Sequence, residues 1–262
     1  MLNGLNFINL ELTSRCNKNC WMCGRRKMEK DGKKTDWGDL PASLAIKVAR
    51  QIPSNTVVAF HSNGEPLLYD ALGQILPQFK HTIRCLDTNG KLLVKRASDI
   101  IDNLDTITVS VIQDDPEGDT QFETVKEFLG IKQSRKPRMI YRLLGEVKDA
   151  ERWSRLPGIV ANRILHSPDG SFNYKKKVTV PEIGICLEAL THLVIDRYGD
   201  VFPCVRFNPD KKDCFGNISN ASLDTIWNST KRQSWLQKHI DGKRKENKLC
   251  STCEFWGIPR GE

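Results

Sequence analysis

Three cysteines, Cys16, Cys20 and Cys23, stand close together near the start of the sequence with the spacing C-x3-C-x2-C. A short loop with three thiolates can hold a cubane iron–sulfur cluster, because the irons of such clusters prefer cysteine ligands. A [4Fe–4S] cluster has four irons, so three cysteines leave one iron without a protein ligand. An open coordination position is characteristic of catalytic metal centres. The segment therefore predicts a catalytic iron–sulfur cluster. A zinc site is the alternative, although no fourth ligand is evident nearby.

A second set of four cysteines lies near the other end of the sequence and predicts a second metal centre. Cys186 and Cys204 belong to the pattern C-x12-G-x4-C, in which Gly199 permits a tight turn that brings the two thiols together. Cys250 and Cys253 follow with the spacing C-x2-C, which lets two thiolates bind one centre from a single turn. Four thiolates suit either an iron–sulfur cluster or a structural zinc ion, and the spacing alone does not choose between them.

The region between these two sets is expected to form a parallel sheet. Short β-branched and apolar runs alternate there with segments of helical periodicity, which is the pattern of repeated βα units. The expected strands are Leu5–Leu12, Thr56–His61, Thr82–Asp87, Thr106–Ile112, Arg138–Leu144 and Ile159–His166. The helices between them include Leu40–Gln51, with Pro41 in its first turn, and one whose apolar stripe is Phe122, Val125, Phe128 and Leu129. The expected fold class is α/β, an open partial (β/α)6 TIM-like barrel with its active site at the carboxyl ends of the strands.

The cysteine-bearing C-terminal part is expected to form a small separate module. Leu190–Tyr198 and Val201–Val205 flank Gly199–Asp200 and predict a β-hairpin, and Ser222–Trp227 predicts a short helix capped by Ser222. The stretch before the module carries turn-forming residues and a lysine run without a clean period. We therefore divide the chain into a partial barrel at residues 1–166, a connecting segment at 167–185 and a cluster-binding domain at 186–262.

The first cysteine motif, directly after the first expected strand, resembles the signature of the radical S-adenosylmethionine (radical SAM) enzymes. This resemblance implies a partial (β/α)6 barrel in which Cys16, Cys20 and Cys23 hold a [4Fe–4S] cluster. It also implies that the open iron chelates the amino and carboxylate groups of S-adenosylmethionine (SAM). Reduction of the cluster would then cleave the sulfonium and give a 5′-deoxyadenosyl radical, which abstracts a hydrogen atom from a substrate.

Further positions match the places where this family binds SAM. Ser62–Pro66 resembles the family's Gly-Gly-Glu-Pro segment, with Asn63 in place of the first glycine. Pro66 favours an extended Glu65 and the Asn-Gly pair permits a tight turn, so backbone carbonyls can face the site. The cofactor-binding residues that the resemblance implies are Asn63, Gly64, Glu65, Pro66, Ser110 and Arg142.

The C-terminal cysteines resemble the shortened "twitch" form of the SPASM extension, in which a strand pair and a helix hold one auxiliary [4Fe–4S] cluster. On this resemblance its ligands are Cys186, Cys204, Cys250 and Cys253, and Cys214 is a spare residue or an alternative ligand. Thr88–Gly90, after the third expected strand, is also typical of the subfamily that carries auxiliary clusters. The implied cofactors are therefore two [4Fe–4S] clusters and SAM.

A cluster whose irons all have cysteine ligands offers no iron to a substrate, so it can transfer electrons or support the structure. This favours oxidation, because an alcohol that loses a hydrogen atom must lose one more electron and a proton to become a ketone. We therefore expect a two-electron dehydrogenation of a small-molecule alcohol such as a sugar or aminocyclitol. In size and cysteine spacing the chain resembles the small aminocyclitol dehydrogenases of this family. An external one-electron reductant of the flavodoxin or ferredoxin type is the implied partner.

Other functions stay open. A peptide-modifying maturase would use the same clusters, although the first expected strand begins almost at residue 5 and leaves little room for a preceding peptide-binding domain. A radical epimerase would need a thiol to return a hydrogen atom, for which Cys85 and Cys214 are candidates. A zinc-stabilised binding protein would have no radical chemistry. The general base of an oxidation is unassigned, because His61, Asp87 and Arg163 all lie near expected strand ends.

Composition and charge exclude further classes. The 262 residues carry 40 Lys and Arg against 32 Asp and Glu, a formal charge of +8, in short basic runs that are explained most simply as solvated faces. No nucleic-acid-binding motif accompanies these runs, so nucleic acid is not expected as a partner. No stretch approaches the ~18 consecutive apolar residues of a membrane span, and no signal peptide is evident. We therefore expect a cytoplasmic protein whose nine cysteines hold metal rather than a disulfide framework.

Overall fold

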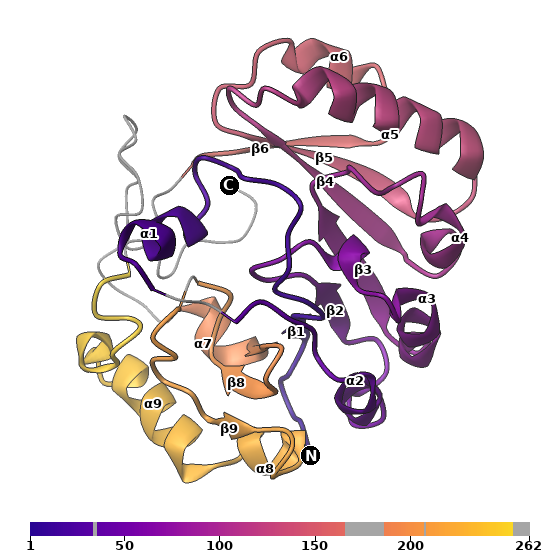
Figure 1. Cartoon of the computed structure of the whole chain (residues 1–262). Coiled ribbons are helices and arrows are strands. Elements are labelled where there is room, and N and C mark those ends of the chain that lie inside the picture. Colours follow the sequence, from indigo (N-terminus) through magenta and orange to yellow (C-terminus); the bar gives the residue numbers. More distant parts are fainter. Residues whose placement is uncertain (34–35, 166–185, 207, 254–262) are drawn as a thin grey trace.

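The computed structural model describes residues 1–33, 36–165, 186–206 and 208–253, and its centre is a nine-stranded sheet (Figure 1). The strand order across the sheet is β6-β5-β4-β3-β2-β1-β7-β8-β9. The strands are β1 (Phe7–Leu10), β2 (Val57–Phe60), β3 (Ile83–Thr88), β4 (Thr106–Ile112), β5 (Arg138–Leu144), β6 (Ile159–Arg163), β7 (His192–Ile195), β8 (Asp200–Phe202) and β9 (Gly216–Asn217). Neighbours from β6 through to β7 pair in parallel, whereas β8 pairs antiparallel with both β7 and β9. The parallel part is the expected open α/β barrel.

Helices line one face of the parallel strands, and Figure 1 shows α2, α3, α4 and α5 in a row along it. The α-helices are α1 (Arg25–Lys30), α2 (Ala42–Ala49), α3 (Leu72–Ile75), α4 (Ala97–Ile100), α5 (Gly118–Lys132), α6 (Ala150–Ser154), α7 (Leu187–Thr191), α8 (Leu223–Trp227) and α9 (Thr230–Ile240). Short 3₁₀ helices are η1 (Pro66–Leu68), η2 (Leu76–Phe79) and η4 (Arg244–Glu246). None of the helices within the described ranges combines the length and the apolar character that a membrane span requires.

The expected strands agree with the observed ones, apart from their ends. β4 and β5 have the expected bounds, and β4 is buried along most of its length, as a central strand covered on both faces should be. β6 ends at Arg163, and His166 lies outside the described residues together with the expected connecting segment 167–185. α2 begins at Ala42 because Pro41 has an extended ψ of 131°, so the proline precedes the first turn instead of lying in it.

Aromatic packing attaches α5 and α6 to the sheet. Val125 and Phe128 of the expected stripe are fully buried, and the ring of Phe122 meets Trp153 edge to face at 5.1 Å between centroids. Trp153 is 0% exposed and lies 5.4 Å from the ring of Tyr141 on β5. This group is therefore the core contact between α5, α6 and the strands under them.

The C-terminal module continues the barrel's sheet instead of forming a separate one. β7 pairs in parallel with β1, in register from Phe7–His192 to Leu10–Ile195, and the hairpin β7–β8 follows from it. Gly199 turns the hairpin with a φ of +81°, and Ser222 caps α8 by accepting the Thr225 N–H, so both expected features are confirmed. The division into a barrel at 1–166 and a cluster-binding domain at 186–262 stays a prediction.

Replacing Trp153 tests this core. Trp153→Ala should lower the free energy of unfolding by about 3–5 kcal/mol, because it leaves a large cavity. The indole N–H is buried and has no hydrogen-bond partner among the described residues. Trp153→Phe keeps an aromatic ring and removes that unpaired group, so its cost should be much smaller, about 1 kcal/mol. Urea unfolding of the metal-free protein under reducing conditions measures both, and equal losses for the two variants would contradict this account.

Candidate active site

The carboxyl ends of the parallel strands border a cavity of about 620 Å³. Strands β2 to β6 and the turns after them contribute His61, Ser62, Asp87, Thr88, Ser110, Arg142 and Arg163 to its wall. The loop after β1 adds Cys16, Cys20 and Cys23, and the C-terminal module adds Cys253. Parallel strands produce this arrangement because their carboxyl ends meet at one edge of the sheet. Both cysteine sets therefore reach the same cavity.

The thiols of the first cysteine set are costly to ionise. Burial raises the pKa of Cys20, and the neighbouring thiols of Cys23 and Cys16 also favour the neutral thiol, whereas Lys18 favours the thiolate. The resulting pKa of Cys20 is about 12. Burial also raises the pKa of Cys23. Because a buried thiolate needs compensating positive charge, these thiols suit a cationic metal group.

The donor type of both cysteine sets fits an iron–sulfur cluster. Thiolates are the ligands that the irons of such clusters prefer, and in a [4Fe–4S] cluster each cysteine binds a different iron.

Neighbouring loops hold the first cysteine loop in place. Lys18, which lies between two of the cysteines, is 8% exposed and forms an ion pair with Asp115 in the loop after β4. The Trp21 indole donates to the Gln113 carbonyl at 2.9 Å. Asn17 accepts from Asn89 Nδ2 at 2.8 Å. Sequence analysis missed these contacts, because an isolated lysine or tryptophan in a loop carries no signal of its partner.

The Ser62–Pro66 segment lies directly against the chain that leads into the cysteine loop. Glu65 N–H donates to the Arg15 carbonyl at 2.8 Å. A Cβ atom added to Gly64 would overlap with the Thr13 carbonyl and lie 2.7 Å from the Arg15 carbonyl oxygen. Gly64 does not have a positive φ. The glycine is therefore required by close backbone approach, which the Asn-Gly pattern alone does not reveal.

Glu65 ties the end of β2 to the end of β3. It is 2% exposed, and its carboxylate accepts from Asn89 N–H and from Thr88 Oγ1, both at 2.7 Å, and from Leu67 N–H at 3.1 Å. Burial raises the pKa of Glu65 to about 7, although these donors favour the carboxylate. The Thr88–Gly90 segment thus has a definite role, which is to hold this glutamate.

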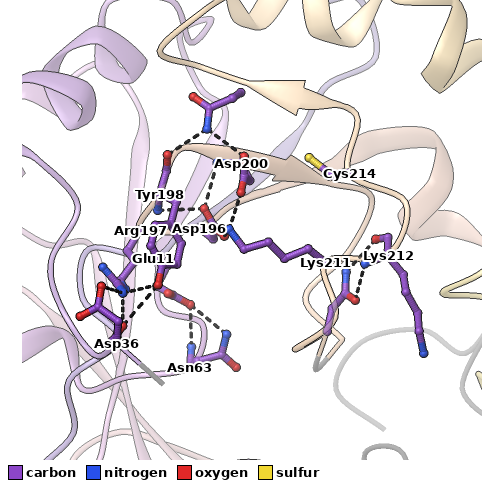
Figure 2. Close-up of polar contacts among 12 residues, drawn as sticks. Glu11, Asp36, Asn63, Asp196, Arg197, Tyr198, Asp200, Lys211, Lys212 and Cys214 are labelled. Atoms are coloured by element: carbon purple, nitrogen blue, oxygen red, sulfur yellow. Dashed lines mark hydrogen bonds and ion pairs between the residues drawn. The ribbon is translucent and has the colours of Figure 1, made fainter. Parts of the chain in front are cut away.

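Asn63, the residue that departs from the Gly-Gly-Glu-Pro pattern, contacts a carboxylate at the end of β1. Its backbone N–H and its Nδ2 both donate to the Glu11 carboxylate, at 3.1 and 3.0 Å (Figure 2). Glu11 follows β1 and is 3% exposed. The asparagine therefore satisfies a buried carboxylate that a glycine would satisfy through its backbone alone.

Ser110 and Arg142 both line the cavity, as expected. The Arg142 guanidinium forms an ion pair with Asp87 on β3. Burial alone would raise the pKa of Asp87, but the neighbouring His61 and Arg142 lower it overall. Gln121 from α5 donates to the Ser110 carbonyl at 2.9 Å and fixes the strand there. SAM contacts from these two residues stay a prediction.

The four C-terminal cysteines lie together. Burial raises the pKa of Cys250, and the thiols of Cys204, Cys253 and Cys186 each raise it further. Burial also raises the pKa of Cys204 to about 12. His239 of α9 lies 3.5 Å from the Cys250 sulfur through its Nε2 and was not anticipated. The hairpin and the C-x2-C turn thus bring one set of four thiols to one place, as their spacing predicted.

Figure 2 shows a group of charged and aromatic side chains where the module meets the residues after the first cysteine loop. The Arg197 guanidinium lies 3.8 Å from the ring centroid of Tyr198 and pairs with Asp36 at 3.1 Å. Lys211 pairs with Asp196 at 3.5 Å. Burial raises the pKa of Asp196 to about 6, although Lys211 favours the carboxylate. This group docks the β7–β8 turn against the segment between the cysteine loop and α2.

The two remaining cysteines lie away from the cavity. Cys85 is on β3, and burial raises its pKa. Cys214 donates to the Gly216 carbonyl at 3.4 Å, beside β8 (Figure 2). Neither belongs to the described residues that line the cavity. The structure thus gives neither thiol a place on the described cavity wall, and a role for either in an epimerase stays a prediction.

Comparisons with known proteins agree with this geometry. Residues 186–254 match the SPASM family, an iron–sulfur cluster-binding domain. The chain is 26% identical to the S-adenosyl-L-methionine-dependent 2-deoxy-scyllo-inosamine dehydrogenase of Niallia circulans over 254 residues, which cover 94% of this chain and 91% of that protein. It is 33% identical to the FeMo cofactor biosynthesis protein NifB of Methanocaldococcus jannaschii over 123 residues, 42% of this chain and 41% of that protein.

Solved structures show the same fold. BtrN in complex with AdoMet and 2-DOIA matches with a TM-score of 0.60 and 20% identity over 95% of this chain and 92% of that chain. Streptococcus suis SuiB bound to S-adenosylmethionine matches with a TM-score of 0.65 and 15% identity over 95% of this chain and 72% of that chain. Two [4Fe–4S] clusters and SAM, the expected cofactors, fit these findings and the two sets of thiols. The comparisons and the two sets of thiols together support a radical SAM enzyme with a C-terminal SPASM-type iron–sulfur domain.

Proposed function

We propose that this enzyme catalyses the two-electron dehydrogenation of a small-molecule alcohol of the sugar or aminocyclitol type. The observation that carries the proposal is the shared cavity, which is lined by Cys16, Cys20 and Cys23 and also by Cys253. A substrate in this space lies between a site of hydrogen abstraction and a possible electron acceptor. The Niallia circulans dehydrogenase, similar over most of both chains, supports an aminocyclitol as the substrate class.

The cavity residues have defined parts in this proposal. Cys16, Cys20 and Cys23 would hold one [4Fe–4S] cluster, which with SAM supplies a 5′-deoxyadenosyl radical when bound. The second cluster, the electron acceptor, would be held by Cys186, Cys204, Cys250 and Cys253. Its four thiols lie together, so all its irons would have protein ligands.

SAM would bind between the strand ends. Asn63, Gly64, Glu65 and Pro66 would present backbone groups to its amino group, because this segment lies against the cysteine loop. Ser110 would face the ribose. Arg142 contacts Asp87 through Nη1, so its other N–H groups can bind the SAM carboxylate.

An external one-electron reductant of the flavodoxin or ferredoxin type and a cytoplasmic location belong to the same proposal. All nine cysteines are free thiols. Free thiols and iron–sulfur clusters are typical of reducing compartments.

Metal content tests the two ligand sets. Protein purified and reconstituted without oxygen should contain about eight irons per chain, and Cys20→Ala or Cys250→Ala should each lose about four of them. Cys85→Ala, a cysteine outside both sets, is the matched control and should keep all of them. Iron, sulfide and zinc are measured together. About four irons with one zinc per chain would remove the auxiliary electron acceptor and the dehydrogenase proposal with it.

Product analysis tests the reaction. With SAM, a one-electron reductant and 2-deoxy-scyllo-inosamine as the probe, the enzyme should form 5′-deoxyadenosine and a ketone in equal amounts. Cys250→Ala should still form 5′-deoxyadenosine, while ketone falls by about tenfold or more because the second cluster is lost. Both products are quantified by mass spectrometry. Ketone formation that is unchanged in this variant would show that electrons leave the substrate by another route.

Replacing Gly64 tests the close approach that shapes the SAM site. Gly64→Ala should weaken SAM binding by about tenfold or more, because the new methyl group displaces the Thr13–Arg15 backbone beside the first cluster. Gly130→Ala is the control, since a Cβ there meets nothing within 4 Å. Calorimetric titration of SAM into reconstituted protein gives both affinities. Equal affinities for the two variants would refute the role given to Gly64.

A further inference from the structure

The proposed dehydrogenation needs a proton acceptor in the cavity, because a ketone forms only when the substrate hydroxyl loses its proton. Apart from the cysteines, the described ionisable side chains that line the cavity are Lys18, Arg25, His61, Glu65, Asp87, Arg142, Arg163 and Arg206. The geometry of each decides whether it can take up a proton.

The cationic side chains cannot serve. Arginine remains protonated in proteins and has no free lone pair. Lys18 forms its buried ion pair with Asp115 and has a second carboxylate, Glu117, at 3.7 Å, so its Nζ already contacts two acidic partners.

The two carboxylates are already occupied. Both oxygens of Glu65 accept hydrogen bonds from Leu67, Thr88 and Asn89, and the residue is 2% exposed. Asp87 is held by Arg142, and its pKa lies below the usual range. The Asp87 carboxylate, stabilised in this way, is a weak base, and Glu65 is excluded because its oxygens are already engaged by three donors.

His61 has the position that a base requires. It follows β2 directly, its side chain is 23% exposed, and it belongs to the cavity wall. Its Nε2 lies 3.6 Å from Asp87 Oδ2, so a proton taken up by the ring would have a carboxylate beside it. A neutral imidazole is also the side chain whose ordinary pKa, about 6.5, is nearest to neutral pH.

A buried amide positions the ring from the opposite side. Asn9 is 0% exposed, and its Nδ2 lies 3.1 Å from Nε2 of His61. Its Oδ1 contacts Nε2 of His192 at 2.8 Å, and His192 in turn pairs with Glu188. The same amide nitrogen lies 3.3 Å from Nδ1 of His61 and donates to the His61 carbonyl at 3.3 Å, so Asn9 holds the ring through contacts with both of its nitrogens and with its backbone.

We propose that His61 is the general base of this enzyme, with Asp87 and Asn9 as its positioning residues; the proposal rests on the dehydrogenation proposed above. In the dehydrogenation, the carbinol C–H hydrogen would leave as an atom to the 5′-deoxyadenosyl radical, and the O–H proton would go to the imidazole ring of His61. Cys186, Cys204, Cys250 and Cys253 would hold the cluster that accepts the remaining electron, so that the C–O bond becomes a carbonyl. Among the described residues, the charged groups around His61 include Asp87 on β3 and, through it, Arg142 on β5, with His192 and Glu188 behind Asn9.

His61→Gln tests the base directly, because a glutamine amide can still accept from Asn9 but cannot take up a proton. The variant should continue to form 5′-deoxyadenosine, while the ratio of 5′-deoxyadenosine to ketone rises by about tenfold or more, as expected for the loss of a general base. His81→Gln is the matched control, since His81 contacts the Ile52 carbonyl and does not belong to the described cavity wall. An unchanged ratio in His61→Gln overturns the assignment and leaves the dehydrogenation standing. Equal loss of both products also overturns it, because His61 would then act before hydrogen abstraction.

The pH profile separates a base from a structural residue. Ketone formation by the wild type should fall on the acid side as His61 becomes protonated, and His61→Gln should lack this dependence. Asp87→Asn should move the acid limb to lower pH, because removal of the carboxylate disfavours the imidazolium. An acid limb that stays in place in both variants would overturn the proposal.

Spectra of the histidine rings show the protonation state of His61 without any substrate. The chain has five histidines, and in spectra of the reconstituted enzyme labelled at the histidine ring the His61 signal is the one missing from His61→Gln. An unprotonated ring at the pH of SAM cleavage supports the base, and a protonated ring there overturns it. If the wild type makes 5′-deoxyadenosine but no ketone from 2-deoxy-scyllo-inosamine, the substrate proposal fails, and the ring measurement still decides the role of His61.

Discussion

Burial of cysteine sulfur is the constraint on which the rest of this structure depends. A thiolate in the interior loses its hydration, which is why the pKa values of Cys20 and Cys204 rise to about 12. These thiols become ligands only when positive charge enters with them, so iron binding and ionisation are one process. The protein holds the first cysteine loop in place through contacts such as Lys18 with Asp115 and the Trp21 indole with the Gln113 carbonyl. Lys18 offsets part of the cost of ionising Cys20, and the metal must neutralise the rest of the buried charge.

The strands and the hairpin could be predicted because their signals are local. β4 and β5 are apolar runs bounded by polar turns. Gly199 marks a turn whose backbone needs a positive φ, which glycine adopts without strain. The spacing of the cysteines in the sequence also indicated which thiols are neighbours in the structure, since the thiols of each expected set lie together. These features depend on neighbours in sequence, so composition and periodicity are sufficient to find them.

The polar contacts of the site could not be predicted, because they join loops that are distant in sequence. Lys18 and Asp115 are 97 residues apart and meet only where the loops after β1 and β4 come together at the mouth of the barrel. The row from His61 through Asn9 to His192 crosses three strands of the sheet. Gly64 is a different case. The sequence pointed to this residue, but the backbone carbonyls that leave no room for a side chain there are seen only in the structure.

The pairing of β7 with β1 has a consequence for how the molecule is made. β1 is synthesised long before β7, its neighbour on one side, which begins 185 residues after β1 starts and pairs with it from Phe7–His192 onward. Until that partner emerges, β1 presents a row of open backbone N–H and carbonyl groups to the surroundings, which is the feature that recruits foreign strands. A pairing of such long sequence separation is also slow to form. During synthesis the first cysteine loop is therefore joined to an incomplete sheet until β7 has been made, and the sheet around it is completed only by the C-terminal module.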